Sequence, residues 1–230
     1  MSKKTLLIDC DGVLYPFSQL TLQDFVSAMK KTYREDVGIN GATQVKISED
    51  TLAKNQLGMF NYIKAICNHA GYNFETFCRK MFDRVDYSKI TRDDGLYQNI
   101  VQASRSQQLV IVTNNHIYHL NNVLKQRFGK SVFDFENIGI RCYDITATEK
   151  NGVFLPKQNP KALTLLTEKI GVSVYDCVML DDTPRNIEAA KSIGMPGILI
   201  DEDFTLKKYL QQEQQKTLNR GKEYDTKHLG

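Results

Sequence analysis

Four short apolar runs, each followed by an acidic or hydroxyl-bearing residue, constrain the fold of this chain more than any other sequence feature. The runs are Thr5–Ile8, Leu109–Val112, Cys177–Leu180 and Gly197–Ile200. Continuous apolar runs of this length are typical of strands buried on both faces, as in a parallel sheet that helices cover. The sequence therefore predicts four strands of such a sheet.

Amphipathic helical patterns separate the later runs. They predict helices over Asn115–Phe128, Pro160–Ile170 and Pro184–Ile193. The last two begin with proline and are followed by glycine, which is the usual asymmetry of helix ends. Strands that alternate with helices predict an α/β fold with a Rossmann-like, doubly wound parallel sheet.

The segment from residue 19 to residue 106 contains almost no strand-like run and predicts an all-helical insertion after the first strand. Its expected helices are Leu20–Tyr33, Glu49–His69, Phe74–Val85 and Asp93–Ala103, with residues 37–46 as a loop. We therefore expect residues 1–18 and 107–210 to form a core and residues 19–106 to form an inserted domain. Residues 211–230 are polar and predict a frayed helix followed by a flexible tail.

Charge, cysteine content and hydropathy exclude several classes of protein. Thirty Lys and Arg against 27 Asp and Glu leave a net charge of +3, too mild to indicate a nucleic acid polymer as partner. The five cysteines are odd in number and widely spaced, which argues against a disulfide framework or a zinc finger. No apolar run is long enough for a signal-peptide core or a membrane span. We expect a cytoplasmic protein; a specialised secretion route, a longer parent chain and the oligomeric state stay open.

Two carboxylates flank a single residue directly after the first predicted strand. Asp9 and Asp11 carry like charges in one tight turn, and such charges repel unless a cation or hydrogen-bond donors compensate them. Gly12 then permits a backbone turn that a residue with a Cβ atom resists. The carboxyl ends of strands are where open α/β sheets bind ligands. The turn is therefore a candidate site rather than a solvated acidic loop.

The other strand ends add matching chemistry. Thr113 and Asn114 follow the second strand, a second acidic pair, Asp181 and Asp182, follows a later one, and Lys157 precedes a predicted helix. Four acids with a hydroxyl and an ammonium predict a divalent cation with oxygen ligands, which is Mg²⁺ before zinc. A hard cation beside a phosphate and a spare carboxylate suggests phosphoryl transfer through an aspartyl-phosphate.

This set of motifs resembles the haloacid dehalogenase (HAD) superfamily over roughly Thr5 to Ile200. The four family motifs appear in order in the segments Asp9–Leu14, Thr113–Asn114, Lys157–Leu163 and Asp181–Met195. The helical insertion is similar to the cap that follows motif one in the branch of phosphoglycolate phosphatases, phosphoglucomutases and pyrimidine nucleotidases. The resemblance implies a core with an inserted all-helical cap.

The resemblance also implies a role for each acidic residue. Asp9 is the expected nucleophile and a metal ligand. Asp11 is the expected acid and base, with its backbone carbonyl on Mg²⁺, and we expect it to need a raised pKa for that work. Asp182 is the expected direct metal ligand, with Asp181 bound directly or through water.

The remaining implied residues bind the phosphoryl group. Thr113, Asn114 and Lys157 are expected to hold it, and Lys157 is expected to orient Asp9 as well. Lys161 lies one helical turn farther on and is an alternative, but the spacing to Pro160 favours Lys157.

Several residues near these motifs carry weaker hypotheses. His116 and His119 are expected to be polar residues that open a helix and line the pocket or its rim, rather than metal ligands. Cys10 is expected to face away from the two acids as a small buried side chain. Tyr15 is expected to bind substrate.

The sequence thus predicts a Mg²⁺-dependent phosphatase that hydrolyses a phosphomonoester through a phosphoenzyme on Asp9. A small phosphorylated metabolite or nucleotide is the expected substrate, and phosphotyrosine on a protein is the alternative. A phosphomutase and a non-catalytic phosphate-binding or interaction module are further alternatives. Dehalogenation is disfavoured because haloacid dehalogenases lack the second acid, which is Asp11 here.

Overall fold

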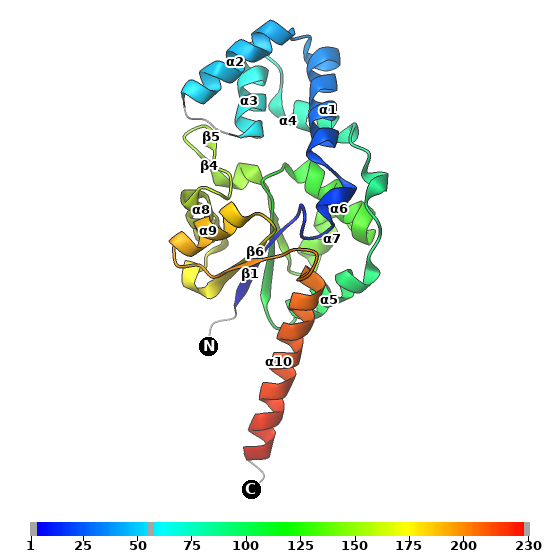
Figure 1. Cartoon of the computed structure of the whole chain (residues 1–230), viewed down its shortest axis with the longest axis vertical. Helices are drawn as coiled ribbons and strands as arrows, with labels where there is room; N and C mark the ends of the chain where they lie inside the picture. The colour runs from blue at the N-terminus through cyan, green and yellow to red at the C-terminus, as the bar shows by residue number, and fades with distance from the viewer. Residues whose placement is uncertain (1–3, 55–57, 228–230) are drawn as a thin grey trace.

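The computed structural model describes residues 4–54 and 58–227, and it contains a parallel sheet of five strands in the order β3-β2-β1-β6-β7 (Figure 1). The strands are β1 (Thr5–Asp9), β2 (Gln108–Val112), β3 (Arg141–Tyr143), β6 (Cys177–Asp181) and β7 (Gly197–Leu199). The predicted α/β fold with a doubly wound parallel sheet is confirmed. The sequence missed β3, an edge strand, because its Arg-Cys-Tyr run is too short and polar to resemble a buried strand.

Different helices cover the two faces of the sheet. Leu6 and Ile8 of β1 pack into the larger core with α5 (Asp94–Ser104), α6 (Ile117–Phe128) and α7 (Val132–Asn137). Leu7 points the opposite way and packs into a second core formed with α8 (Pro160–Ile170) and α9 (Pro184–Ser192). This alternation is what a strand buried on both faces requires.

The insertion between β1 and β2 is helical. Its longer helices are α1 (Leu22–Thr32), α2 (Gly41–Ala53), α3 (Met59–Ala70), α4 (Phe74–Asp83) and α5. The short helical turns are η1 (Phe17–Gln19), η2 (Tyr33–Val37) and η3 (Tyr87–Lys89). Because α5 packs against β2, α6 and α10 (Leu206–Lys227) of the core, we use the name cap for α1 to α4 only.

Two expectations within the cap are wrong. The predicted loop over residues 37–46 contains the start of α2, because the Asn40 side chain accepts a 2.9 Å hydrogen bond from the Thr43 amide and begins the helix there. The predicted helix Glu49–His69 is two helices, because Gly58 has a φ of +112°, which an α-helix does not contain. Residues 55–57 of that predicted helix lie outside the described residues.

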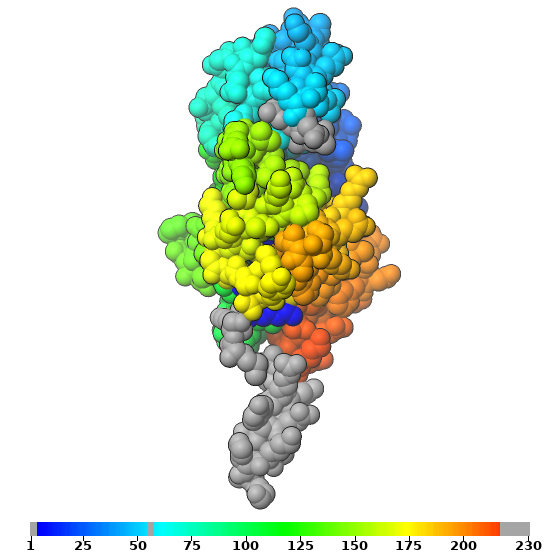
Figure 2. Space-filling model, turned by 90° about the vertical axis from the view of Figure 1, so that its left-hand side faces the viewer, coloured from blue at the N-terminus to red at the C-terminus, as the bar shows by residue number. Residues whose placement is uncertain are grey.

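The cap lies over the carboxyl ends of the strands, and the segment that contains β4 (Glu149–Lys150) and β5 (Val153–Phe154) lies against it (Figure 2). The Asn61 side chain of α3 donates to the backbone oxygen of Phe154 and accepts from its backbone nitrogen, both at 2.8 Å. Lys64 adds a 2.6 Å ion pair with Glu149. These contacts tie α3 to the core segment that leads to Lys157.

The last helix of the described residues is α10 (Leu206–Lys227), which begins against α5 and points away from the cap (Figure 1). Leu206, Tyr209 and Leu210 are buried in the larger core. This helix is longer than the frayed helix that the sequence predicts. Residues 1–3 of the predicted core and residues 228–230 of the predicted tail lie outside the described residues. Short turns η4 (Ile145–Thr148) and η5 (Val174–Asp176) complete the core. Among the described residues, no helix combines the length and apolar composition needed to cross a membrane.

Candidate active site

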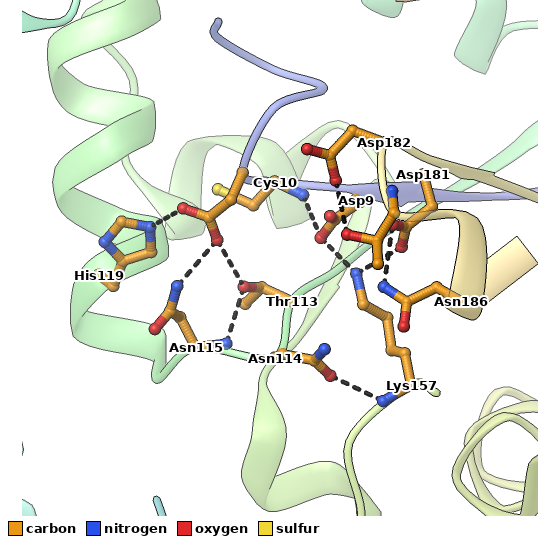
Figure 3. Close-up of polar contacts among 12 residues, drawn as sticks. Asp9, Cys10, Thr113, Asn114, Asn115, His119, Lys157, Asp181, Asp182 and Asn186 are labelled. Atoms are coloured by element: carbon orange, nitrogen blue, oxygen red, sulfur yellow. Dashed lines mark hydrogen bonds and ion pairs between the residues drawn. The ribbon is translucent and has the colours of Figure 1, made fainter. Parts of the chain in front are cut away.

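The predicted polar residues meet at one edge of the sheet because β1, β2 and β6 are adjacent and parallel. Asp9 is the last residue of β1, Thr113 follows β2, and Asp181 is the last residue of β6. Figure 3 shows Asp9, Lys157, Asp181 and Asp182 directed toward a common point. The structure thus brings together the side chains of three strand ends and of the loop before α8.

Lys157 is the cation of this cluster. Its side chain is 5% exposed, contacts the Asp9 carboxylate and lies 2.8 Å from Oδ2 of Asp181. The Asn114 side chain accepts a 2.8 Å hydrogen bond from the Lys157 backbone nitrogen, so the loop after β2 fixes the loop before α8. Lys161, the alternative lysine, is exposed on α8.

The cluster carries more negative than positive charge. Burial and the carboxylate of Asp181 raise the pKa of Asp9, whereas Lys157 lowers it. Burial and Asp181 also raise the pKa of Asp182. Burial lowers the pKa of Lys157, but Asp9 and Asp181 outweigh this effect and raise it above its ordinary value. A single ammonium therefore faces three acids, and a second cation would relieve their repulsion.

The geometry fits a hard divalent cation. One carboxylate oxygen from each of Asp9, Asp181 and Asp182 lies within 4.8 Å of the others. Asn186 and the backbone nitrogen of Thr183 each donate a 2.9 Å hydrogen bond to Oδ1 of Asp181, which fixes the orientation of that carboxylate. Oxygen ligands of this kind suit Mg²⁺. The predicted side-chain ligands Asp9, Asp181 and Asp182 are thus together.

Gly12 allows the acidic turn to approach Asp182 closely. Its φ is +76°, and a Cβ atom at this position would lie 2.1 Å from Oδ2 of Asp182. Both the backbone conformation and the available space therefore require glycine here. Gly12 thus allows the turn after Asp9 and Asp11 to lie directly against Asp182.

Asp11 has a different environment from Asp9. Its Oδ1 atom accepts hydrogen bonds from the Tyr15 hydroxyl at 2.5 Å and from Nε2 of His119 at 2.8 Å. Its Oδ2 atom accepts one from Asn115 at 2.8 Å and a longer one from Thr113 at 3.4 Å. The Asp11 carboxylate therefore lies in a ring of donors, apart from the cluster of Asp9, Asp181 and Asp182.

This ring corrects one expectation from the sequence. Burial acts to raise the pKa of Asp11, but electrostatic attraction to the His119 ring and hydrogen bonds from His119, Tyr15 and Asn115 outweigh it and hold this pKa well below its usual range. The raised pKa expected for an acid is therefore wrong for this arrangement. Tyr15, expected to bind substrate, is 1% exposed and its hydroxyl binds Asp11.

Sequence reasoning gave too little weight to His119 and did not single out Asn115. Both follow Thr113 and Asn114, with Asn115 just before α6 and His119 in its first turn, and this position near a strand end was the available indication. His116 is buried as well, but its Nε2 atom lies 3.3 Å from Glu75 of α4 in the cap. Cys10 is buried as expected, but the expectation that it faces away from both acids is wrong, because its Sγ atom lies within 4.8 Å of an oxygen atom of Asp11 and a ring nitrogen of His119. Burial raises the pKa of its thiol well above the usual value, which disfavours a role as a ligand.

A cavity of about 240 Å³ lies between the cap and the core beside these residues. Its walls include Leu22, Phe60, Asn114, Asn115, Phe154 and Gln158. Among the described residues, no charged side chain lines this cavity. A larger cavity of about 440 Å³ lies between the turn after β1 and the start of α10, where Gly12 and Asp182 form part of its wall.

Residues 3–194 match the family model of the haloacid dehalogenase-like hydrolases. The chain belongs to this family. As a haloacid dehalogenase-like hydrolase, it also shares its fold with solved structures of low sequence identity. CbbY from Rhodobacter sphaeroides in complex with phosphate is 16% identical, with 89% of each chain covered and a TM-score of 0.55.

Two further haloacid dehalogenase-like structures have comparable similarity. A HAD family enzyme from Bacteroides thetaiotaomicron, solved with magnesium and inorganic phosphate, is 15% identical with a TM-score of 0.51, and 87% of this chain and 95% of that chain are covered. A protein described as a β-phosphoglucomutase from Thermotoga maritima is 15% identical with a TM-score of 0.50, and 93% and 99% are covered. At such identities the likeness shows the shared fold.

Proposed function

We propose that this haloacid dehalogenase-like hydrolase is a Mg²⁺-dependent phosphatase that hydrolyses phosphomonoesters through a phosphoenzyme on Asp9. The observation that carries the proposal is the contact of the Asp9 carboxylate with the buried Lys157, within 4.8 Å of oxygen atoms of Asp181 and Asp182. A carboxylate held in this way is both positioned and compensated in charge for attack on phosphorus.

The proposed reaction has two steps. An oxygen atom of Asp9 attacks phosphorus, the bond between phosphorus and the leaving oxygen breaks, and Asp11 gives that oxygen a proton. Water then gives its proton to Asp11 and attacks phosphorus, which releases inorganic phosphate and restores Asp9. Mg²⁺, held by Asp9, Asp181, Asp182 and the backbone carbonyl of Asp11, would neutralise charge on the phosphoryl oxygens.

Lys157, Thr113 and Asn114 would bind and orient the phosphoryl group. Lys157 lies beside the nucleophile, where its ammonium would balance the negative charge that the phosphoryl oxygens bring. Thr113 is buried directly after β2, and its hydroxyl also accepts a 2.9 Å hydrogen bond from the backbone nitrogen of Asn115. Relatives of the same fold solved with phosphate and with magnesium support this assignment.

Asp11 would act after a change of hydrogen-bond partner. The four hydrogen bonds to Asp11 stabilise its ionised carboxylate. To protonate the leaving oxygen, Asp11 must therefore lose one of these hydrogen bonds and contact that oxygen instead. The contact with Thr113, at 3.4 Å, is the longest of the four. Oδ2 is therefore the oxygen atom that would turn to the leaving group.

The cavity between cap and core supports an uncharged leaving group. Its walls combine apolar side chains with the amides of Asn114, Asn115 and Gln158, and no charged side chain lines it among the described residues. A small phosphorylated metabolite or nucleotide fits this chemistry. Phosphotyrosine is the second candidate, favoured by the aromatic walls Phe60 and Phe154. A phosphomutase is disfavoured because no charged side chain among the described residues of this cavity would hold a second phosphate.

Phosphate release with Mg²⁺ or with EDTA tests the proposal. The substrates are p-nitrophenyl phosphate, nucleoside monophosphates, sugar phosphates and peptides that carry phosphotyrosine, phosphoserine or phosphothreonine. The parent should release phosphate with Mg²⁺ and without a bisphosphate primer, Asp9→Asn should not, and Asp50→Asn, an exposed aspartate of the cap, should match the parent. Release that persists in Asp9→Asn, or is absent from the parent on every substrate, would overturn the proposal.

A further inference from the structure

His119 lies between Asp11 and Tyr87 in the interior of the protein. Its side chain is fully buried, with Nε2 at 2.8 Å from Oδ1 of Asp11 and Nδ1 at 2.9 Å from the Tyr87 hydroxyl. Both ring nitrogens therefore have a partner. One partner is the expected acid of the reaction, and the other belongs to the segment that returns from the cap to the core.

The partners fix which nitrogen carries the proton in the neutral ring. A carboxylate only accepts hydrogen bonds, so Nε2–H donates to Asp11. Nδ1 is then the acceptor, and the Tyr87 hydroxyl donates to it. The chain of donors runs from Tyr87 through His119 to Asp11.

Side chains of the cap enclose the imidazole ring. The ring centroid of Phe25 in α1 lies 5.1 Å from that of His119, and the centroid of Phe82 in α4 lies 5.4 Å away. The Tyr87 ring lies at 5.7 Å. Since Phe25 and Phe82 are themselves buried, the position of the cap determines where the imidazole sits.

The two oxygen atoms of Asp11 are held to different degrees. Tyr15 and His119 bind Oδ1 at 2.5 and 2.8 Å, whereas the second contact of Oδ2, to Thr113, is 3.4 Å long. Oδ1 is thus the anchored atom, and Oδ2 faces the side where Asn115 lines the cavity.

We propose that His119 is a positioning residue that anchors Oδ1 of Asp11 and so presents Oδ2 to the leaving oxygen, with the cap aromatics holding the imidazole in register. This inference rests on the proposed function, in which Asp11 protonates the leaving group. The competing view is that His119 is a buried core residue whose polar atoms happen to be satisfied.

The two views differ in how the rate depends on the leaving group. Phenyl phosphate and p-nitrophenyl phosphate have similar shapes, but phenolate is the poorer leaving group and needs the proton from Asp11 more. The value of kcat/KM reports steps up to the departure of the leaving group. A change in the ratio of kcat/KM values for the two substrates, from parent to variant, therefore reports a change in that proton transfer. A loss of packing alone lowers both values equally.

The test compares His119→Phe, which keeps a ring but loses the donor, with His119→Gln, which restores a donor near Nε2. We expect His119→Phe to lower kcat/KM for phenyl phosphate about tenfold more than for p-nitrophenyl phosphate, within the range of general acid catalysis. His119→Gln should recover part of the ratio. His116→Gln, a change at a buried histidine of the same segment that does not bind Asp11, should leave the ratio as in the parent.

If His119→Phe loses kcat/KM equally on both substrates, or does not lose it, the proposal for His119 is overturned. Phosphate release by the parent would still support the proposed function in that case. If His119→Phe does not fold, Tyr87→Phe decides, because it removes one hydroxyl and keeps the packing; it should shift the ratio in the same direction by a smaller factor. A nitrogen NMR spectrum of the parent should show the proton on Nε2 of His119. A neutral ring with the proton on Nδ1 would contradict the arrangement.

Discussion

The Nζ atom of Lys157 lies 2.8 Å from Oδ2 of Asp181, with both side chains almost fully buried. This ion pair joins the loop before α8 to the end of β6, and the contact of Lys157 with Asp9 joins both to the end of β1. A buried charged group is costly unless an opposite charge pairs with it, and this ion pair therefore allows both groups to lie in the interior. The pair therefore holds the nucleophile and an expected metal ligand in a fixed relation.

Replacement of Lys157 should abolish most of the activity. Lys157→Ala removes the ammonium beside the phosphoryl site, and we expect kcat for p-nitrophenyl phosphate to fall by about a hundredfold or more. Lys161→Ala, the matched change at the exposed lysine of α8, should change kcat less than about twofold. The opposite order would assign the catalytic lysine to position 161.

Gly12→Ala should disturb the metal site beyond its effect on the backbone. The added Cβ atom would meet Oδ2 of Asp182 at 2.1 Å, whereas a Cβ atom at Gly38 meets nothing within 4 Å although its φ, +71°, is similar. Both variants should lose about 1–2 kcal/mol of unfolding free energy from the left-handed backbone. By calorimetry, only Gly12→Ala should bind Mg²⁺ about tenfold or more weakly. Equal Mg²⁺ affinities in the two variants would show that Asp182 moves aside freely or does not bind the ion.

The cap should loosen when its buried amide contact with the core is lost. Asn61→Ala removes both 2.8 Å hydrogen bonds to the Phe154 backbone, and we expect a loss of about 1–3 kcal/mol in unfolding free energy. The KM should rise because Phe154 lines the cavity. Asn68→Ala, at an exposed asparagine of the same helix, should change neither quantity. Urea unfolding and steady-state kinetics measure the two effects. An unaltered KM in Asn61→Ala would show that the hydrogen bonds between Asn61 and Phe154 do not affect substrate binding.

The Asp24 carboxylate should stabilise the fold in a pH-dependent way. Hydrogen bonds from Lys89 and Thr21 lower the pKa of Asp24 to about 2, from an ordinary value of 3.8. Because the folded value is the lower one, the contribution is complete above the ordinary pKa and is lost as the pH falls toward 2. Asp24→Asn should therefore cost about 0.5–1 kcal/mol at neutral pH, in line with an acid in the first turn of a helix.

Chemical denaturation at several pH values measures this contribution. The difference in unfolding free energy between the parent and Asp24→Asn should shrink as the pH falls from 5 to 3. A difference that stays constant over this range would mean that the ion pair with Lys89 does not persist in solution.

The parallel sheet and the acid cluster were predictable because each depends on a local pattern. Apolar runs that end in Asp9 or Asp181 mark both a buried strand and its carboxyl end, and adjacent parallel strands must bring those ends together. The helical character of the insertion followed from its periodicity. The boundaries of α2 and α3 did not, because a capping side chain, Asn40, and the backbone at Gly58 determine them.

The environment of Asp11 was beyond the reach of the sequence because it depends on tertiary contacts. Tyr15 follows β1, whereas Asn115 and His119 follow β2 about a hundred residues later, and their convergence on Asp11 lowers the pKa that chemistry alone suggested should rise. His119 resembled an ordinary polar residue near the start of a helix, since nothing local shows that Phe25 and Phe82 of the cap bury it. Contacts between cap and core are thus the part of the site that the sequence leaves unspecified.

The most direct test of the account is to trap the phosphoenzyme. The parent, turning over p-nitrophenyl phosphate with Mg²⁺, is quenched in acid and reduced with borohydride, which converts an aspartyl-phosphate to homoserine, and peptides are analysed by mass spectrometry. The account predicts homoserine at position 9, and none at that position when substrate is omitted. Homoserine at another aspartate, or undiminished turnover in Asp9→Asn, would contradict it.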